Sequence, residues 1–209
     1  GTTWSLRSPA TSPPRLDAPS FVYDTVHKVS VLFGGRVEGD VPQATTWLWN
    51  GDTWTDAQPV TAPSARFLAT ATYVEADGQV VLWGGCSQGN CGAASLTDAW
   101  ACNGSTWAPA PEHDLPEPRR NSLVAYDTRR AVAVWHGGRR DDQSLPTATW
   151  EHSEGAWQER LPQAAPTDLS VPYMAYDAAR EVSVVHGAAS QVNLDSFRTE
   201  TWEWDGSAW

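Results

Sequence analysis

One phrase recurs along this chain at a nearly constant spacing, and this repeat constrains the fold more than any other feature. Its clearest copy begins with Val80–Gly85, an apolar run that ends in two glycines, and closes at Trp107. The closing tryptophans of the successive copies are Trp4, Trp54, Trp107, Trp157 and Trp209. They lie about 50 residues apart, and self-similarity at a fixed period of this length is the signature of a repeat architecture. Each copy is therefore expected to form one structural unit.

Each copy reads as four short antiparallel strands, which we name A, B, C and D in chain order. In the first copy, residues 20–24 and 29–33 alternate β-branched and aromatic residues around a polar turn, which predicts an A–B hairpin. Residues 45–49 and 53–55 flank Asn50-Gly51, the strongest short-range hairpin signal, in which both turn residues need a positive φ. No helical period appears anywhere in the sequence. The chain is therefore predicted to be all-β.

The four copies divide the chain into units that follow one another along its length, joined by loops. They cover residues 16–57, 66–110, 119–160 and 169–209, and residues 1–6 read as an additional strand D at the start. The whole of 1–209 is therefore expected to be a single domain.

These landmarks resemble a Kelch repeat, most closely the bacterial form that reads YD…VVLFGG…TWxWdGxxW. In the first copy they are Tyr23-Asp24, Gly34-Gly35, Trp47 and Trp54. The resemblance covers nearly the whole chain and implies a β-propeller of four-stranded blades with one repeat per blade. The departures from the pattern are Gly187-Ala188 for a diglycine, Val74 for the Asp after Tyr73, and Ser153-Glu154-Gly155 at the third C–D turn.

Four repeats with one additional strand allow three arrangements. The chain could form a compact four-bladed ring in which Thr2–Leu6 pairs beside Thr199–Trp204, it could be part of a longer propeller, or two chains could complete one ring as a homodimer. We expect the four-bladed ring closed by the N-terminal strand, because an open end would leave unpaired strand edges that invite aggregation.

Composition narrows the classes of partner. The chain has 14 Lys and Arg against 25 Asp and Glu, a net charge of -11, which argues against nucleic acid or an anionic membrane surface as the main partner. No apolar run approaches the roughly 18 residues that cross a bilayer. No signal peptide is visible, but the chain opens inside a repeat, so the compartment stays undetermined.

The three cysteines leave two readings open. Cys86 and Cys91 share one loop and could form a small disulfide, which would leave Cys102 on a strand. Three reduced thiols explain the same spacing equally well.

The longer loops indicate which face of the propeller carries function. If strand A is innermost and the strands alternate in direction, the D–A and B–C loops share one face, and the tight A–B and C–D turns share the other. Loops on a rigid scaffold carry function more often than the scaffold itself. We therefore expect the site on the long-loop face.

Aligning the four repeats identifies candidate residues on that face. The last residue of strand B is Phe33, Trp83, His136 and His186 in turn, so two histidines depart from an aromatic position. A second aligned position lies seven residues before the strand A Tyr. It is Leu16, Arg66, Arg119 and Leu169 in blades 1 to 4, and we call these residues and the last residues of strand B the two rows. We expect these rows to converge at the mouth of the central channel, where the ligand-binding candidates are Asp17, Phe33, Arg66, Trp83, Arg119, Arg120 and Arg139.

Two functions fit these candidates. The first is a binding module that holds a small molecule or a protein segment on the long-loop face, and it is favoured because no nucleophile elbow, phosphate loop, nucleotide fingerprint or zinc motif appears. The second is an isomerase, cyclase or lyase that uses His136 and His186 with the nearby arginines, since histidine titrates near neutrality. The two histidines could also simply fill an aromatic position and bind the backbone.

No cofactor or metal is expected. A metal set of His136 and His186 with Glu112, His113 or Asp114 lacks any diagnostic ligand spacing. All 13 tryptophans occupy repeat positions, so packing between blades explains them, and Trp83 alone is a candidate for stacking on a ligand.

Overall fold

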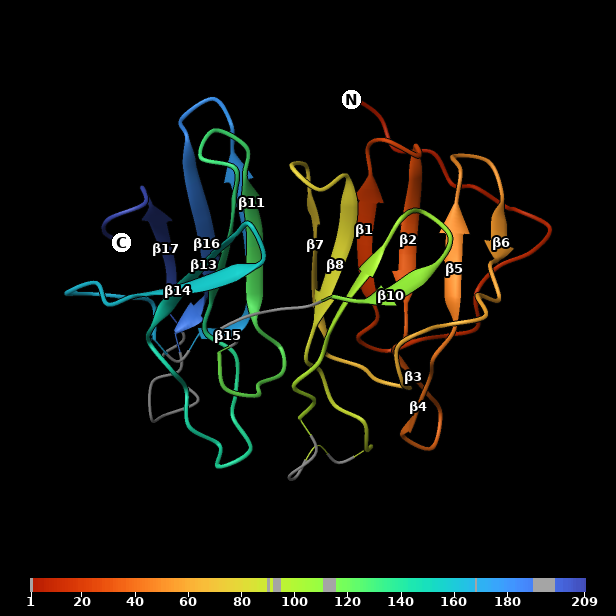
Figure 1. Ribbon diagram of the computed structural model, residues 1–209, viewed down its shortest axis with the longest axis horizontal. Helices are drawn as coiled ribbons and strands as arrows, with labels where there is room; N and C mark the ends of the chain where they lie inside the picture. The colour runs from red at the N-terminus through yellow and green to blue at the C-terminus, as the bar shows by residue number, and fades with distance from the viewer. Residues whose placement is uncertain (1, 90, 92–94, 111–115, 168, 190–197) are drawn as a thin grey trace.

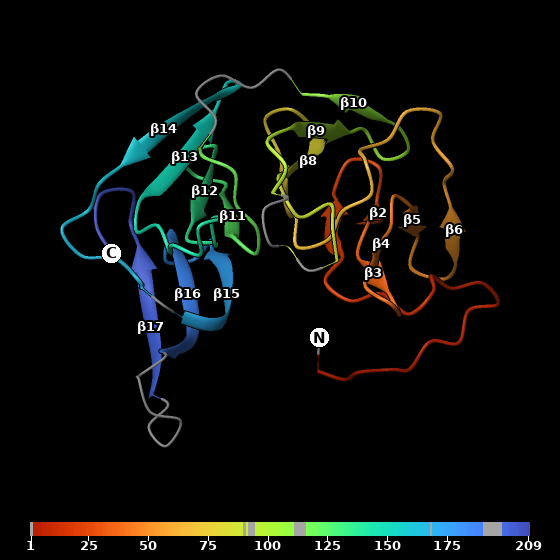
Figure 2. The same cartoon turned by 90° about the horizontal axis from the view of Figure 1, so that it is seen from below.

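The chain folds into four small antiparallel sheets arranged as a four-blade β-propeller (Figure 1, Figure 2). The computed structural model describes residues 2–89, 91, 95–110, 116–167, 169–189 and 198–209. These residues contain strands and turns but no helix. Accordingly, the described chain offers no apolar helix of bilayer-spanning length. The all-β prediction is confirmed.

The strands follow the predicted order within each blade. Blade 1 contains β1 (Ser20–Asp24), β2 (Val29–Phe33), β5 (Thr46–Trp49) and β6 (Trp54–Asp56). Blade 2 contains β7 (Thr70–Val74), β8 (Gln79–Trp83), β9 (Ala99–Cys102) and β10 (Trp107–Pro109), and blade 3 contains β11 (Leu123–Asp127), β12 (Val132–His136), β13 (Thr149–Ser153) and β14 (Ala156–Arg160). Blade 4 has three strands, β15 (Leu169–Asp177), β16 (Val182–Ala189) and β17 (Arg198–Trp204). The B–C loop of blade 1 adds a small hairpin, β3 (Arg36–Val37) with β4 (Val41–Pro42), that sequence reasoning read as a loop.

Carboxylate and carboxamide side chains shape the short turns. Asp24 Oδ1 accepts hydrogen bonds from the amides of Val26 and His27 in the A–B turn, and the equivalent Asp127 and Asp177 do the same in blades 3 and 4. These bonds explain why an Asp follows the strand A Tyr in three of the four repeats, since a side chain that bonds the backbone nearby favours a turn.

The C–D turn of blade 1 differs in detail from the expected one. Asn50 Oδ1 accepts hydrogen bonds from the amides of Asp52 and Thr53, and Gly51 adopts a φ of 98°. Asn50 itself does not have a positive φ. The prediction that both residues would adopt one was wrong, because the Asn50 carboxamide stabilises the turn from the position before it.

Strand A is innermost, and successive A strands contact one another. β1 packs on β7, β7 on β11 and β11 on β15, so the four sheets stand in sequence order around an axis (Figure 2). Apolar side chains fill the gaps between blades. Phe33, Tyr73, Leu82 and Trp107 belong to the cluster between blades 1 and 2, and burial of such side chains is the main favourable term in folding.

The closing tryptophans are the main inter-blade contacts. Trp107 of blade 2 packs on Phe33 of blade 1 with ring centroids 5.1 Å apart, and its Nε1 donates to Thr46 Oγ1 at 3.0 Å. In the same way Trp157 packs on Trp83 at 5.2 Å. The indoles of Trp107, Trp157 and Trp209 thus each lie against the last strand B residue of the preceding blade. This geometry explains why the tryptophans recur with the repeat.

The N-terminal segment does not close the ring as expected. Residues 2–6 form no strand, and Trp4 and Leu6 are 103% and 94% exposed. The expectation that they pair beside β17 is therefore wrong in this structure. A physical reason is that Trp209 already packs against Trp204 and against blade 3, in the place of a closing strand D residue.

Blades 1 and 4 stand at the two ends of the array (Figure 2). Among the described residues, β15 and β1 lack the close packing that joins neighbouring A strands elsewhere. The outer faces of blades 1 and 4 therefore do not cover each other.

Candidate functional site

The D–A and B–C loops share one face of the propeller, at the bottom of Figure 1. Backbone bridges pair a residue before strand A with one after strand B in three blades: Asp17 with Arg36, Phe67 with Cys86, and Arg120 with Arg139. These bridges hold the bases of the long loops together. The predicted grouping of loops on one face is thus present.

Arg66 links two blades from a fully buried position. Its guanidinium makes two hydrogen bonds to the Asp98 carboxylate, at 2.7 and 2.8 Å, and Nη1 also donates to the Gly84 carbonyl. Its own carbonyl accepts a hydrogen bond from the Gly35 amide of blade 1. Partial burial alone would raise the pKa of Asp98, but the hydrogen bonds from Arg66 and Trp100 and the charge of Arg66 outweigh it and lower this pKa.

Arg119 repeats this arrangement between blades 2 and 3. It donates to the Gly137 carbonyl at 3.1 Å and to Glu117 at 3.0 Å, and its guanidinium lies 5.1 Å from the Trp135 ring centroid. Burial lowers the pKa of Arg119 to about 10, although the negative charge of Glu117 acts in the other direction. Arg119 therefore remains charged at neutral pH. Both arginines therefore join blades.

Phe33 and Trp83 lie inside the blade interfaces rather than at a channel mouth. Phe33 is covered by Trp107, and Trp83 is enclosed by Trp135, Trp157 and His152. In this conformation neither ring offers a face for stacking on a ligand.

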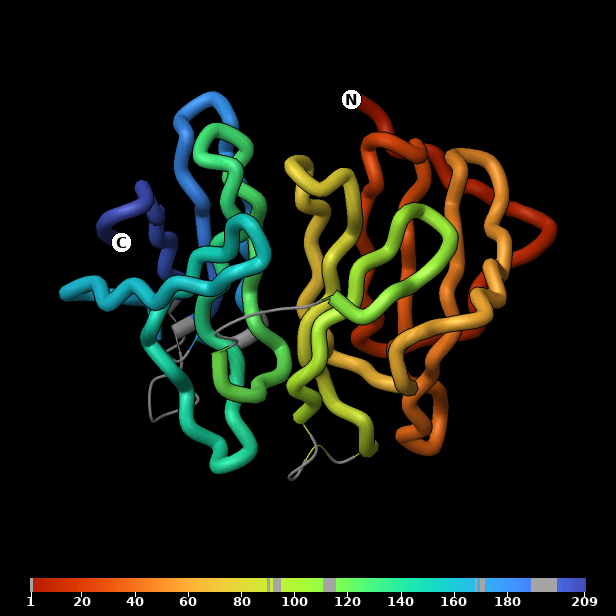
Figure 3. Tube along the Cα trace, in the orientation of Figure 1, coloured from red at the N-terminus to blue at the C-terminus, as the bar shows by residue number. Residues whose placement is uncertain are grey.

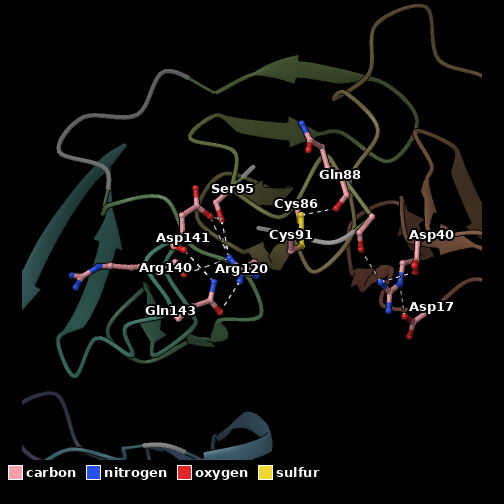
Figure 4. Close-up of a disulfide and its surroundings, with 12 residues drawn as sticks. Asp17, Asp40, Cys86, Gln88, Cys91, Ser95, Arg120, Arg140, Asp141 and Gln143 are labelled. Atoms are coloured by element: carbon pink, nitrogen blue, oxygen red, sulfur yellow. Dashed lines mark hydrogen bonds and ion pairs between the residues drawn. A yellow bond between two sulfur atoms is a disulfide. The ribbon is translucent and has the colours of Figure 1, made fainter. Parts of the chain in front are cut away.

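Two polar clusters lie on the long-loop face, one on each side of a disulfide (Figure 4). In the first, Arg36 contacts Asp17 at 2.8 Å and Asp40 at 2.9 Å, and its guanidinium lies over the Phe67 ring. The disulfide joins Cys86 and Cys91, so the paired reading of these cysteines holds.

The second cluster surrounds Arg120. Its guanidinium lies 3.3 Å from Asp141 and donates to Ser95 and Gln143, while Ser95 donates to Asp141 at 2.7 Å. Arg139 is exposed beside it and donates to Gln143 at 3.4 Å. The structure thus brings Arg120 and Arg139 together, and it places Asp17 in the other cluster.

His136 is buried with both ring nitrogens hydrogen-bonded. The Pro166 carbonyl can only accept, so in the neutral ring Nε2 carries the proton and Nδ1 accepts from the Thr149 hydroxyl, 3.1 Å away, while Thr149 Oγ1 accepts from Trp209 Nε1 at 2.7 Å. The His136 Nε2–H then donates to the Pro166 carbonyl at 3.0 Å. Burial lowers the pKa of His136 to about 4, so the ring is neutral at pH 7.

His186 occupies the equivalent position in blade 4 but is exposed, with Nδ1 2.9 Å from Thr201 Oγ1. His136 faces blade 4, whereas His186 faces away from blade 3 on the outer side of blade 4. The structure does not bring the two histidines to one site.

A cavity of about 80 Å³ opens on the long-loop face between blades 3 and 4. It is lined by Asn121, Leu123, His136, Gly137, Gly138, Arg139, Leu145, Pro146, Pro166, Thr167, Leu169 and Pro172. Most of these side chains are apolar, and Arg139 is the cationic one.

The cavity lies where the arginine row is interrupted. A Cβ atom on Gly34 would lie 2.4 Å from the Arg66 carbonyl and one on Gly84 would lie 2.8 Å from the Arg119 carbonyl, whereas one on Gly137 would meet nothing within 4 Å. The next residue in that row is Leu169, which cannot make the guanidinium contacts. Sequence reasoning missed this cavity, although Leu169 in the place of an arginine was a visible signal.

Among the described residues, no group of three or more His, Cys, Asp or Glu is arranged to hold a metal ion. The metal candidates Glu112, His113 and Asp114 lie outside the described residues.

Comparison with known proteins shows the fold alone. No family model and no curated protein matches the chain. Among solved structures, YjhT is similar with a TM-score of 0.66 and 11% sequence identity, over 89% of this chain and 66% of that one. The chain therefore spans less than two thirds of the YjhT chain, and at this identity the similarity extends to the propeller architecture and not to a function.

Proposed function

We propose that this protein is a propeller-type binding module that holds a small ligand or the end of a protein segment on its long-loop face. The Kelch resemblance of the repeats agrees with this assignment. The observation that carries the proposal is the cavity between blades 3 and 4, at the place where Leu169 interrupts the arginines that join the other blades. Ligand sites of this kind combine an apolar lining with a few placed polar groups.

The lining favours a short aliphatic group that carries a carboxylate. Leu123, Leu145 and Pro146 supply apolar contacts, and Arg139 supplies a cation next to the backbone of Gly137 and Gly138. An arginine recognises a carboxylate through charge-assisted hydrogen bonds. A cavity of about 80 Å³ suits a branched group of a few carbon atoms better than a large ligand.

Isovalerate tests this proposal, with isovaleramide as its neutral counterpart. We expect isovalerate to shift the backbone amide resonances of Gly137, Gly138 and Leu145 in a ¹⁵N-labelled sample. Isovaleramide should bind at least about tenfold more weakly in the same titration, because it lacks the carboxylate charge. Arg139→Gln should remove the difference, whereas Arg129→Gln should preserve it, because Arg129 lies on a turn of the opposite face. Equal shifts from both compounds, or no shifts near the cavity, would refute the proposal.

The enzyme alternative has one supporting observation, since His136 and Arg139 both line the cavity. Against an acid or base role, both nitrogens of His136 are already hydrogen-bonded and His186 lies elsewhere. An isomerase, cyclase or lyase that uses both histidines would lose turnover in His136→Phe and in His186→Phe alike. Loss in His136→Phe alone would instead point to the cavity.

A further inference from the structure

The outer faces of blades 1 and 4 carry matching halves of an interface that the structure already shows between blades 3 and 4. In that interface Trp209 packs on His136 with ring centroids 4.9 Å apart and donates to Thr149. Trp204, also from blade 4, donates from Nε1 to Glu151 at 3.0 Å and is almost completely buried. Two indoles of one blade are thus received by a His, a Thr and a Glu of the preceding blade.

Blade 4 repeats the receiving set on its exposed face. Register places His186 opposite Thr201, as His136 is opposite Thr149, and Glu203 opposite Val184, as Glu151 is opposite Val134. His186 and Thr201 are already hydrogen-bonded to each other. Arg180 pairs with Glu203, as Arg130 pairs with Glu151. All three receiving residues on blade 4 are exposed.

Blade 1 repeats the inserting set. Trp49 and Trp54 stand at the positions of Trp204 and Trp209, and they pack on each other with centroids 5.3 Å apart. Phe21 packs on Trp54 on the same face, and Phe21 and Tyr23 are both more than half exposed. A group of partly exposed aromatic side chains on the outer face of an end blade indicates a contact surface.

The other two interfaces use different residues, so the match is specific. Blade 1 receives Trp107 with Phe33 and Thr46, and blade 2 receives Trp157 with Trp83 and Ala99. The positions equivalent to Glu151 are Leu48 and Ala101, and the residues inserted opposite them are Cys102 and His152 rather than tryptophan. A receiving glutamate therefore accompanies a pair of inserted tryptophans.

We propose that blade 1 of one copy docks on blade 4 of a second copy, with Trp54 against His186 and Thr201 and with Trp49 donating to Glu203. Within one chain the two faces are held at opposite ends of three packed blade interfaces, so a second copy is the occupant that reaches both. A head-to-tail pair satisfies both faces of each copy and closes a ring of eight blades, which is within the range of propellers. This inference is independent of the cavity on the long-loop face.

Light scattering on the purified chain tests the proposal. We expect a dimer for the chain itself, and a loss of at least about 30-fold in association for Trp54→Ala and for Thr201→Arg, because buried tryptophans at an interface centre carry much of the binding. Trp4→Ala is the matched control, since Trp4 is fully exposed and belongs to neither the inserting nor the receiving set, and it should remain dimeric. Because Thr201 is exposed, Thr201→Arg tests the interface even if Trp54→Ala misfolds.

Mixing the variants distinguishes docking of the two faces from any other association. Trp54→Ala retains its receiving face and Thr201→Arg retains its inserting face, so the mixture should form a heterodimer through one remaining interface although neither variant pairs with itself. A chain that is monomeric at its highest soluble concentration overturns the proposal, and so does a dimer that both variants leave intact. A monomer in which the Trp54 indole N–H is protected from exchange with solvent in NMR spectra would show closure within one chain, which also overturns the proposal.

Discussion

At the scale of single residues, burial decides the chemistry more than residue type does. His136 and His186 occupy the same repeat position and each bonds a threonine, yet His136 is covered by Trp209 and the Pro166 carbonyl while His186 is exposed. Burial lowers the pKa of the covered His136 ring to about 4.

The lowered pKa of His136 predicts a specific acid sensitivity. Because the unfolded ring titrates near 6.5 and the folded ring near 4, the unfolded state binds more protons between these values, so stability falls as the pH falls from 6.5 to 4. The free energy of unfolding should drop by about 3 kcal/mol over this range from His136 alone. In His136→Phe this part of the slope should vanish, as measured by urea unfolding at several pH values, whereas His186→Phe should retain it. An unchanged slope in His136→Phe would contradict the assignment.

The ion pair of Arg66 with Asp98 predicts a second effect of single residues. Asp98→Asn removes the charge that compensates a fully buried guanidinium, so we expect a loss of about 2 to 3 kcal/mol in the free energy of unfolding. This is less than for a fully buried pair, because the Asp98 side chain is 41% exposed. Since the folded pKa of Asp98 is lowered, the stabilisation is present above the unfolded pKa of 3.8 and disappears as the pH falls through the folded pKa. The loss of unfolding free energy caused by Asp98→Asn should therefore shrink below about pH 4. A loss that does not depend on pH would contradict a stabilising role of the charge on Asp98.

At the scale of elements, the strands follow from local patterns and the contacts between blades from a repeated indole. A closing tryptophan finds a threonine hydroxyl in the interfaces of blade 1 with blade 2 and of blade 3 with blade 4. In the interface of blades 2 and 3 the equivalent residue is Ala99, and the buried Nε1 of Trp157 has no hydrogen-bond partner. The closing tryptophan between blades 2 and 3 thus lacks the hydroxyl acceptor that the closing tryptophans of the other two interfaces have.

Removing that hydroxyl between blades 1 and 2 should measure what it contributes. Thr46→Val keeps the side-chain volume but leaves Trp107 Nε1 buried without an acceptor, so we expect a loss of about 1 to 2 kcal/mol in denaturant unfolding. In a Trp107→Phe background the same substitution should cost less, because the donor is gone. Equal costs in both backgrounds would show that the hydrogen bond is not responsible.

At the scale of the whole molecule, the two end faces set the assembly. If two copies dock through Trp54 and His186, the melting temperature of the chain should rise with protein concentration, because association stabilises the folded state by mass action. Scanning calorimetry of Trp54→Ala should show a melting temperature independent of concentration. A concentration-independent melting temperature for the unchanged chain would argue against the dimer.

The repeat by itself determined the propeller, the order of strands within each blade and the grouping of long loops on one face. These features depend on neighbours close in sequence, such as Asp24 bonding the turn that follows it, and on a period that every copy shares. Local pattern alone also predicted a strand at Thr2–Leu6, but the structure assigns no strand to these residues.

Only the tertiary structure decided which candidate residues are accessible. We expected Arg66, Arg119 and Trp83 at the mouth of the central channel, but all three are buried. Trp135 and Trp157 of the next blade cover Trp83, and the guanidinium groups of Arg66 and Arg119 are enclosed by carbonyl and carboxylate groups of the loops beside them. The cavity beside Gly137 also depends on the next blade, because no backbone carbonyl lies over Gly137 as the carbonyls of Arg66 and Arg119 lie over Gly34 and Gly84. Burial is set by packing between units distant in sequence, so a pattern within one unit could not reveal it.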